Sequence, residues 1–175
     1  WGELDHSTVV HVTQGTISNY PAQLLRPALE ALADEPVLVV ACTGRIDEGL
    51  EALGPLPANV RVASYIPYGA LLPKTSLVLT NGGFQGVQAV LSHGIPMVTA
   101  GESEDKPEVC ARLQRTGASI DLGTANPAPA AIRSAVRRVL NEPGFRAAAN
   151  ALAREASDAG GAVGAVDAIE AALKR

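Results

Sequence analysis

The strongest constraint on the fold of this 175-residue chain is a repeated alternation of short apolar runs with amphipathic stretches. The runs are rich in β-branched residues, and the stretches between them carry apolar residues at helical spacing. Strands that are apolar on both faces are typical of a parallel sheet with helices on each side. The pattern predicts an α/β fold, a Rossmann-like doubly wound parallel sheet of about six strands with flanking helices. The expected strands are residues 9–13, 37–41, 60–65, 77–80, 96–100 and 118–122.

Helices are expected between these strands and after the last one. No repeat and no long linker divides the chain, so residues 1–175 are expected to form a single domain. A final helix follows the Gly160-Gly161 break, and we expect it to be packed, with Val163, Val166, Ile169 and Leu173 on one side. The other expected helices are residues 20–33, 46–53, 87–93, 107–115 and 145–159, with a further helix around 132–140.

Charge and composition exclude several classes of partner. The net charge of −4 argues against nucleic acid or an anionic membrane as the main partner. No apolar run approaches a membrane span, and the first residues lack the features of a signal peptide. The two cysteines, Cys42 and Cys110, have no metal-ligand spacing and are too few for a disulfide framework. We therefore expect a cytoplasmic protein. The start at Trp1 indicates a processed product or part of a longer chain.

Two glycine-containing turns follow the first and fourth expected strands. The stronger is Asn81–Gly86, where a strand end meets a helix start, and the weaker is Gln14–Thr16. In a doubly wound sheet these turns lie at the crevice where the strand order reverses. Free N–H groups at a helix N-terminus favour an anion, and glycines let a phosphate approach the backbone. Each turn by itself is equally consistent with a simple connection between elements.

The same architecture serves NAD-dependent dehydrogenases, but their signature is missing. The first strand is followed by Gly15 alone rather than G-x-G-x-x-G, and the second ends in Cys42–Arg45 without an acidic residue. The P-loop pattern is absent as well. The spacing leaves a nucleotide held through its phosphates near the fourth strand.

Four motifs in order resemble the C-terminal half of family 1 glycosyltransferases of the GT-B fold. They are Tyr65–Leu72, Asn81–Gly83, His93–Pro96 and Glu104–Glu108, and the resemblance extends from about Val9 to Ala172. It is to the bacterial natural-product and UDP-glucuronosyl/UDP-glucosyltransferase-like type. In that family the C-terminal domain binds a UDP- or TDP-sugar, while the N-terminal domain binds the acceptor and supplies the catalytic base. The resemblance therefore implies half of an enzyme, with no catalytic residue in this chain.

The resemblance also implies roles for individual residues in binding the nucleotide. Tyr65 would stack on the pyrimidine with Ile66 beside it, although a strand-end aromatic covering the core is the plain alternative. Asn81 stands where the family commonly has a His on the diphosphate, so a charged contact is replaced by a neutral one. The ribose-binding Glu of the family would fall at Ala89, which leaves Gln88 for that contact. The remaining nucleotide-binding candidates are Gln14, Gly15, Thr16, Gly82, Gly83, Phe84, Gln85 and Gly86.

The sugar-reading Asp-Gln pair of the family appears here as Asp105-Lys106. An ammonium offers only donors, so Lys106 cannot read sugar hydroxyls as a Gln does. Asp105 has a second explanation, because Asp105 and Glu108 have the spacing of a capping box at a helix start.

The resemblance implies an inverting transfer of a hexose from a UDP- or TDP-sugar to a small hydroxylated acceptor, without a required metal or other cofactor. The expected partners are the nucleotide-sugar donor, an N-terminal acceptor-binding domain of the same enzyme and the small-molecule acceptor. Two alternatives remain open at this point: a sugar-nucleotide epimerase of the same fold, and a non-catalytic nucleotide-binding module.

Overall fold

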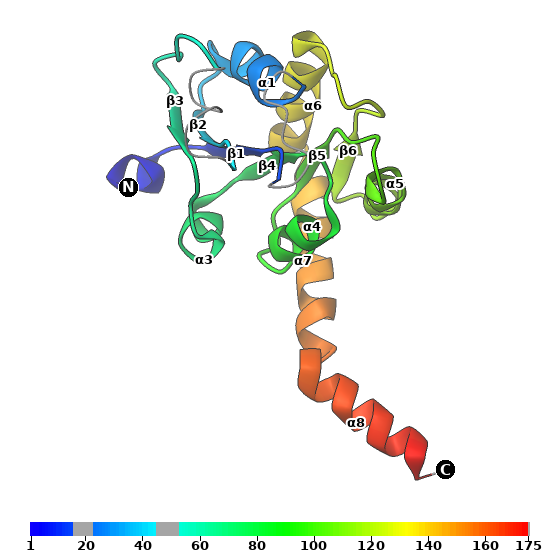
Figure 1. Ribbon diagram of the computed structural model, residues 1–175. Helices are drawn as coiled ribbons and strands as arrows, with labels where there is room; N and C mark the ends of the chain where they lie inside the picture. Colours follow the sequence, from blue (N-terminus) through cyan, green and yellow to red (C-terminus); the bar gives the residue numbers. More distant parts are fainter. Residues whose placement is uncertain (16–22, 45–52, 175) are drawn as a thin grey trace.

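The computed structural model describes residues 1–15, 23–44 and 53–174 and contains a six-stranded parallel sheet (Figure 1). The strand order is β3-β2-β1-β4-β5-β6, and all five pairings are parallel. This is the doubly wound order predicted from the sequence. The strands are β1 (Val9–Thr13), β2 (Leu38–Cys42), β3 (Val60–Ala63), β4 (Leu77–Thr80), β5 (Met97–Thr99) and β6 (Ser119–Asp121).

The central strands are buried from end to end, which is why their sequences are apolar without alternation. Every residue of β1, β2, β4 and β5 is buried. The chain reverses its direction across the sheet between β1 and β4, where Thr13 pairs with Thr80. Both strands therefore end at the same level, and the loops after them start side by side.

Helices cover the two faces of the sheet, as Figure 1 shows. One face packs against α1 (Leu25–Leu32) and α6 (Pro129–Asn141), whose buried residues join those of β1, β2 and β4. The other face packs against α4 (Phe84–Leu91), α5 (Lys106–Arg115) and α7 (Pro143–Asp158), with the 3₁₀ turn η2 (Leu72–Lys74). The short α3 (Tyr68–Leu71) buries Leu71 against Val9 and Val40, and a 3₁₀ turn η1 (Gly2–His6) precedes the sheet.

Several helices begin at other residues than expected, among them α4 and α1. Helix α4 begins at Phe84 rather than at residue 87, because Gly83 adopts an extended conformation and takes the N-cap position. The second half of the glycine cluster is therefore the first turn of a helix. Helix α1 begins at Leu25, and residues 20–22 of its expected range, like 46–52 of the next helix, lie outside the described residues.

The expectation that the last helix is packed was wrong. Helix α8 (Gly161–Leu173) has no buried residue, and it extends away from the sheet in Figure 1. Its apolar side chains are 53–81% exposed: Val163, Val166, Ile169 and Leu173. Among the described residues, none of the helices combines the length and the apolar composition needed to span a membrane.

Candidate functional site

A cavity of about 290 Å³ opens at the carboxyl ends of β1 and β4, where the strand order reverses. Three segments build it: the end of β1 with its loop, the loop that leads into α4, and the loop before α5. The chemistry of its lining is mixed, with backbone amides, hydroxyls, carboxamides and charged groups. The lining residues are Thr13, Gln14, Gly15, Tyr68, Thr80, Asn81, Gly83, Phe84, Gln85, Gly86, Glu104, Asp105 and Lys106.

The side chain of Asn81 joins the two glycine turns. Its Nδ2 donates to the backbone carbonyl of Gln14 at 2.5 Å, and its Oδ1 accepts from the N–H of Gly83 at 3.3 Å. One amide group thus holds the loops after β1 and β4 in register. Because the Nδ2 group has a second hydrogen, Asn81 keeps a donor after making both contacts.

The glycines of these turns occupy their positions for different structural reasons. Gly15 and Gly82 adopt positive φ angles of 75° and 80°, which side chains with a Cβ rarely tolerate. A Cβ on Gly82 would also lie 2.3 Å from Cys110 Sγ, so Gly82 is a packing residue and does not line the cavity. Gly86 is different, since a Cβ there would meet nothing within 4 Å. Because Gly86 has no side chain, open space remains beside the first turn of α4.

The first turn of α4 presents backbone donors to this cavity. No side chain caps the helix, and the N–H of Val87 is the first to bond within it, to the carbonyl of Gly83. Phe84, Gln85 and Gly86 line the cavity. Their backbone N–H groups come before the first hydrogen bond of the helix and have no acceptor within it. Uncapped amides at the positive end of a helix form a place for an anion.

Charged groups enter from the loop before α5. Lys106 is buried, and its Nζ forms an ion pair with the Glu104 carboxylate and donates to Ser103 Oγ at 3.2 Å. Glu104 has φ of 58°, which makes it the one residue with a Cβ at positive φ in the described part of the chain. The carboxylate of Asp105 is exposed beside this pair.

The expected capping box does not form. Asp105 occupies the N-cap position of α5 but makes no side-chain cap hydrogen bond. Its backbone, at φ −84° and ψ −7°, is helical, whereas a capping side chain needs the extended conformation. The helix therefore does not use the carboxylate, and Asp105 is one of the residues that line the cavity.

Tyr65 and Ile66 lie outside this cavity. The Tyr65 ring is 73% exposed, and both residues line a separate cavity of about 420 Å³ with Leu38, Val40 and Leu71. The Ile66 side chain packs on the same apolar cluster. The chain between the two cavities is short, since Pro67 follows and Tyr68 already lines the first one.

Gln88 is a further candidate that is not brought to the cavity, since it is exposed and does not line it. The candidate Thr16 lies outside the described residues. Gln14 is buried, and its Nε2 donates to Gln23 Oε1 at 3.0 Å while its own Oε1 has no partner among the described residues. An orphaned buried acceptor of this kind is costly unless a ligand or water satisfies it.

The structure adds four lining residues that the sequence analysis missed: Thr13, Tyr68, Thr80 and Glu104. The two threonines end their strands, and Thr13 Oγ1 accepts from the N–H of Gly15 at 3.3 Å. The strand-end position was a usable signal, because ligands bind beyond the carboxyl ends of parallel strands. Tyr68 makes an edge contact with the His11 ring at 5.6 Å, which no local pattern indicates.

Burial holds three titratable side chains near the site neutral: His11, Cys42 and Cys110. Burial lowers the pKa of His11 to about 4, against the opposing effect of its hydrogen bond with the Val40 carbonyl at 2.9 Å. Burial raises the pKa of the Cys42 thiol to about 11, and it raises the pKa of Cys110 as well. At neutral pH the imidazole therefore carries no charge, and neither cysteine is a thiolate nucleophile. In the described ranges, no three His, Cys, Asp or Glu side chains gather as metal ligands.

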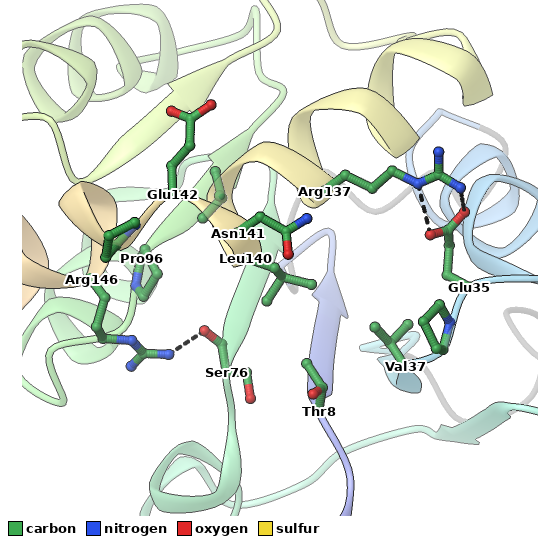
Figure 2. Close-up of a pocket in the computed structure, with 13 residues that line it drawn as sticks. Thr8, Glu35, Val37, Ser76, Pro96, Arg137, Leu140, Asn141, Glu142 and Arg146 are labelled. Carbon is green, nitrogen blue, oxygen red and sulfur yellow. Dashed lines mark hydrogen bonds and ion pairs between the residues drawn. The ribbon is translucent and has the colours of Figure 1, made fainter.

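A third cavity, of about 390 Å³, lies at the amino ends of the strands, the ends opposite to the first cavity (Figure 2). Its charged side chains are already engaged. Arg137 pairs with Glu35 at 2.8 Å, and Arg146 donates to the backbone carbonyls of Gly94 and Ser76. These contacts tie α6 and α7 to the sheet, so we assign this cavity a structural role.

Comparison with known proteins identifies the family. The model of the erythromycin biosynthesis protein CIII-like C-terminal domain matches residues 28–169. The chain belongs to this family. The match confirms the resemblance to the C-terminal half of family 1 glycosyltransferases of natural-product type. The family match favours the glycosyltransferase hypothesis over the sugar-nucleotide epimerase and over the non-catalytic nucleotide-binding module.

Individual relatives agree with this assignment. The chain is 50% identical over 171 residues to 4'-demethylrebeccamycin synthase of Lentzea aerocolonigenes, and 42% identical over 157 residues to UDP-glucosyltransferase A1 of Starmerella bombicola. These matches cover 97% and 89% of the chain but only 40% and 34% of the relatives. Among solved structures, the calicheamicin glycosyltransferase CalG4 superposes with a TM-score of 0.84 at 29% identity, over 97% of this chain and 44% of that one.

Proposed function

We propose that this chain is the donor-binding half of a glycosyltransferase and holds a UDP- or TDP-sugar in the cavity between β1 and β4. The observation that carries the proposal is the uncapped first turn of α4, which lines a cavity at the switch point of the sheet. Related structures support the ligand class: the spinosyn rhamnosyltransferase SpnG has been solved with thymidine diphosphate, and VinC with DTDP.

The two ends of the cavity suit different parts of such a donor. The diphosphate fits the amides of Phe84, Gln85 and Gly86, where positive partial charge is concentrated. The sugar fits the opposite end, since the exposed carboxylate of Asp105 can accept hydrogen bonds from its hydroxyl groups. The base would stack on the exposed ring of Tyr65, and Ile66, held in the core by its side chain, offers its backbone.

The contribution of this half to the reaction is electrostatic. As the sugar leaves, negative charge grows on the departing nucleotide diphosphate, and fixed amide dipoles stabilise that charge without reorganising. The acceptor hydroxyl and the base that deprotonates it belong to a partner domain, from which inversion at the anomeric carbon follows by direct displacement. No metal or other cofactor is required in this proposal.

Nuclear magnetic resonance tests the location of the donor. Titrating the labelled chain with UDP or TDP is expected to shift the amide signals of Gly83–Gly86, Gly15 and Tyr65. The signals of Arg137 and Arg146, on the far side of the sheet, serve as internal controls and are expected to stay unchanged. Shifts confined to the far cavity, or none at all, would contradict the proposal.

A further inference from the structure

We propose that Lys106 supplies the positive charge that stabilises the donor's diphosphate, and that its ammonium exchanges the Glu104 carboxylate for phosphate oxygens when the donor binds. This inference rests on the proposed function, and it assigns Lys106 to the diphosphate rather than to the sugar. No bond is made or broken in the step. An ion pair within the protein is replaced by one with the ligand.

The position of Lys106 is unfavourable for a cation that has only a structural role. It is the first residue of α5, where the positive end of the helix dipole repels an ammonium, and its side chain is 7% exposed. Burying a charge is costly unless it is paired. An apolar residue would fill this place without either cost, so the charge itself requires an explanation.

The partner of Lys106 is held under strain. Glu104 has a Cβ and yet adopts a positive φ of 58°, a strained conformation that is concentrated at ligand sites. Its side chain is 55% exposed, in contrast to that of Lys106. In this proposal the exposed Glu104 carboxylate moves toward solvent when an anion arrives, while the buried Lys106 stays at the cavity.

Lys106 is packed close to Asn81, whose side chain carries no charge. A Cβ on Gly101 would lie 2.1 Å from the backbone oxygen of Asn81 and 3.0 Å from Cβ of Lys106, so Gly101 is what allows these two segments to approach. Among the residues that line the cavity, Lys106 is the one cation, whereas Glu104 and Asp105 are carboxylates. With Asn81 neutral, a diphosphate would meet a net negative lining unless the ammonium of Lys106 were released to it.

The test compares ligands that differ in phosphate number on variants of the full chain. Lys106→Met removes the charge and keeps the length, Lys106→Arg keeps the charge, and Glu104→Gln removes the competing carboxylate. Binding of uridine, UDP and UDP-glucose is measured by titration at constant ionic strength, after the fold of each variant has been checked by circular dichroism.

We expect Lys106→Met to weaken UDP binding roughly ten- to hundredfold, the range for losing one hydrogen bond to a charged group. Uridine binding should change less than about twofold, and Lys106→Arg should keep most of the affinity for UDP. Glu104→Gln should tighten UDP binding. That sign is diagnostic, because a pair that merely holds the loop would lose affinity when either partner is removed.

Three results would overturn the inference. The first is weaker UDP binding in Glu104→Gln, and the second is equal loss of uridine and UDP binding in Lys106→Met. The third is unchanged UDP binding with altered binding of sugar nucleotides, which would make Lys106 a sugar contact. If Lys106→Met fails to fold, the sign of the Glu104→Gln effect decides by itself. A folded wild-type chain that binds no UDP or TDP would instead refute the proposed function.

Discussion

Gly101 is packed against Asn81 whereas Gly86 adjoins open space, so substitutions at the two glycines should have different effects. A Cβ on Gly101 would overlap the backbone oxygen of Asn81, which no side-chain rotation can relieve. We expect Gly101→Ala to lower the free energy of unfolding by about 2 kcal/mol or more, in line with other overpacked sites. Urea denaturation measures the change, and a loss below about 0.5 kcal/mol would contradict the close packing of these two loops.

Gly86→Ala is the matched variant in which folding and binding separate. The added Cβ meets no atom of the protein, and alanine stabilises a helical position by about 0.5–1 kcal/mol relative to glycine. The same Cβ stands where a phosphate would approach α4, so UDP affinity should fall although stability is kept. Thermal unfolding and a UDP titration on one sample test both parts. Unchanged affinity would remove Gly86 from the phosphate site.

His11 makes the stability of the fold depend on pH. Its folded pKa of about 4 lies below the value of 6.5 for an unperturbed imidazole, so the unfolded chain binds the proton more strongly. Stability is full above pH 6.5 and falls as the pH drops toward 4, by about 1.4 kcal/mol per unit and roughly 3 kcal/mol in total.

Urea denaturation between pH 7 and 4 measures this dependence, with His11→Gln as the comparison. The variant should be less stable at pH 7, because it loses the packing of a fully buried ring, but its stability should fall less steeply in this window. Equal slopes for the two proteins would show that another group carries the pH dependence.

How far single residues could be predicted depended on whether their role is local. The turn Asn81–Gly86 was recognised because a strand end, glycines and a helix start adjoin in sequence. The hydrogen bond from Asn81 to Gln14 spans 67 residues, and the pair of Lys106 with Glu104 depends on a strained backbone. Neither leaves a periodic trace. The capping box failed for the same reason, since its spacing was present without the required backbone conformation.

At the scale of elements, α8 is the part of the chain least supported by the rest. None of its residues is buried, and its apolar side chains face solvent. Ending the chain after Asp158, the last residue of α7, should therefore change the free energy of unfolding by less than about 0.5 kcal/mol. Ending it before Pro143 should be severely destabilising. Helix α7 buries Ala149 and packs Leu152 in the core on the sheet face that α4 and α5 also cover. Denaturation of both truncated chains tests the contrast.

The difference between the strands and α8 explains which elements were predictable. The strands are continuous β-branched runs because both of their faces are buried, so composition and burial agree. In α8 the spacing of apolar residues marks the correct side of a helix but says nothing about what covers it. The start of α4 differs from the expected one by three residues because Gly83, rather than a polar side chain, occupies the cap.

At the scale of the whole molecule, the chain spans only 40% of 4'-demethylrebeccamycin synthase and 34% of UDP-glucosyltransferase A1. We expect it to show no transferase activity alone, because the proposed acceptor pocket and base lie in a partner domain. A donor-hydrolysis and transfer assay with UDP-glucose and a phenolic acceptor tests this. Robust glycosylation by the chain alone would contradict the division of labour.

Donor binding is expected to be independent of divalent metal. The proposed site stabilises the diphosphate through the α4 amides and Lys106. A chelator at about 5–10 mM, a concentration that strips divalent ions, should therefore leave the affinity for UDP unchanged. A titration with and without the chelator measures this. A loss of binding that Mg²⁺ or Mn²⁺ restores would show that a metal completes the site.

The central claim is that the cavity between β1 and β4 holds a pyrimidine nucleoside diphosphate, and calorimetric titration of the folded chain with UDP and with TDP tests it most directly. The account predicts saturable heat with a stoichiometry of one for at least one of them, weakened in Gly86→Ala and absent when NAD replaces the ligand. No saturable heat from either diphosphate, with a sample that circular dichroism shows to be folded, would contradict it.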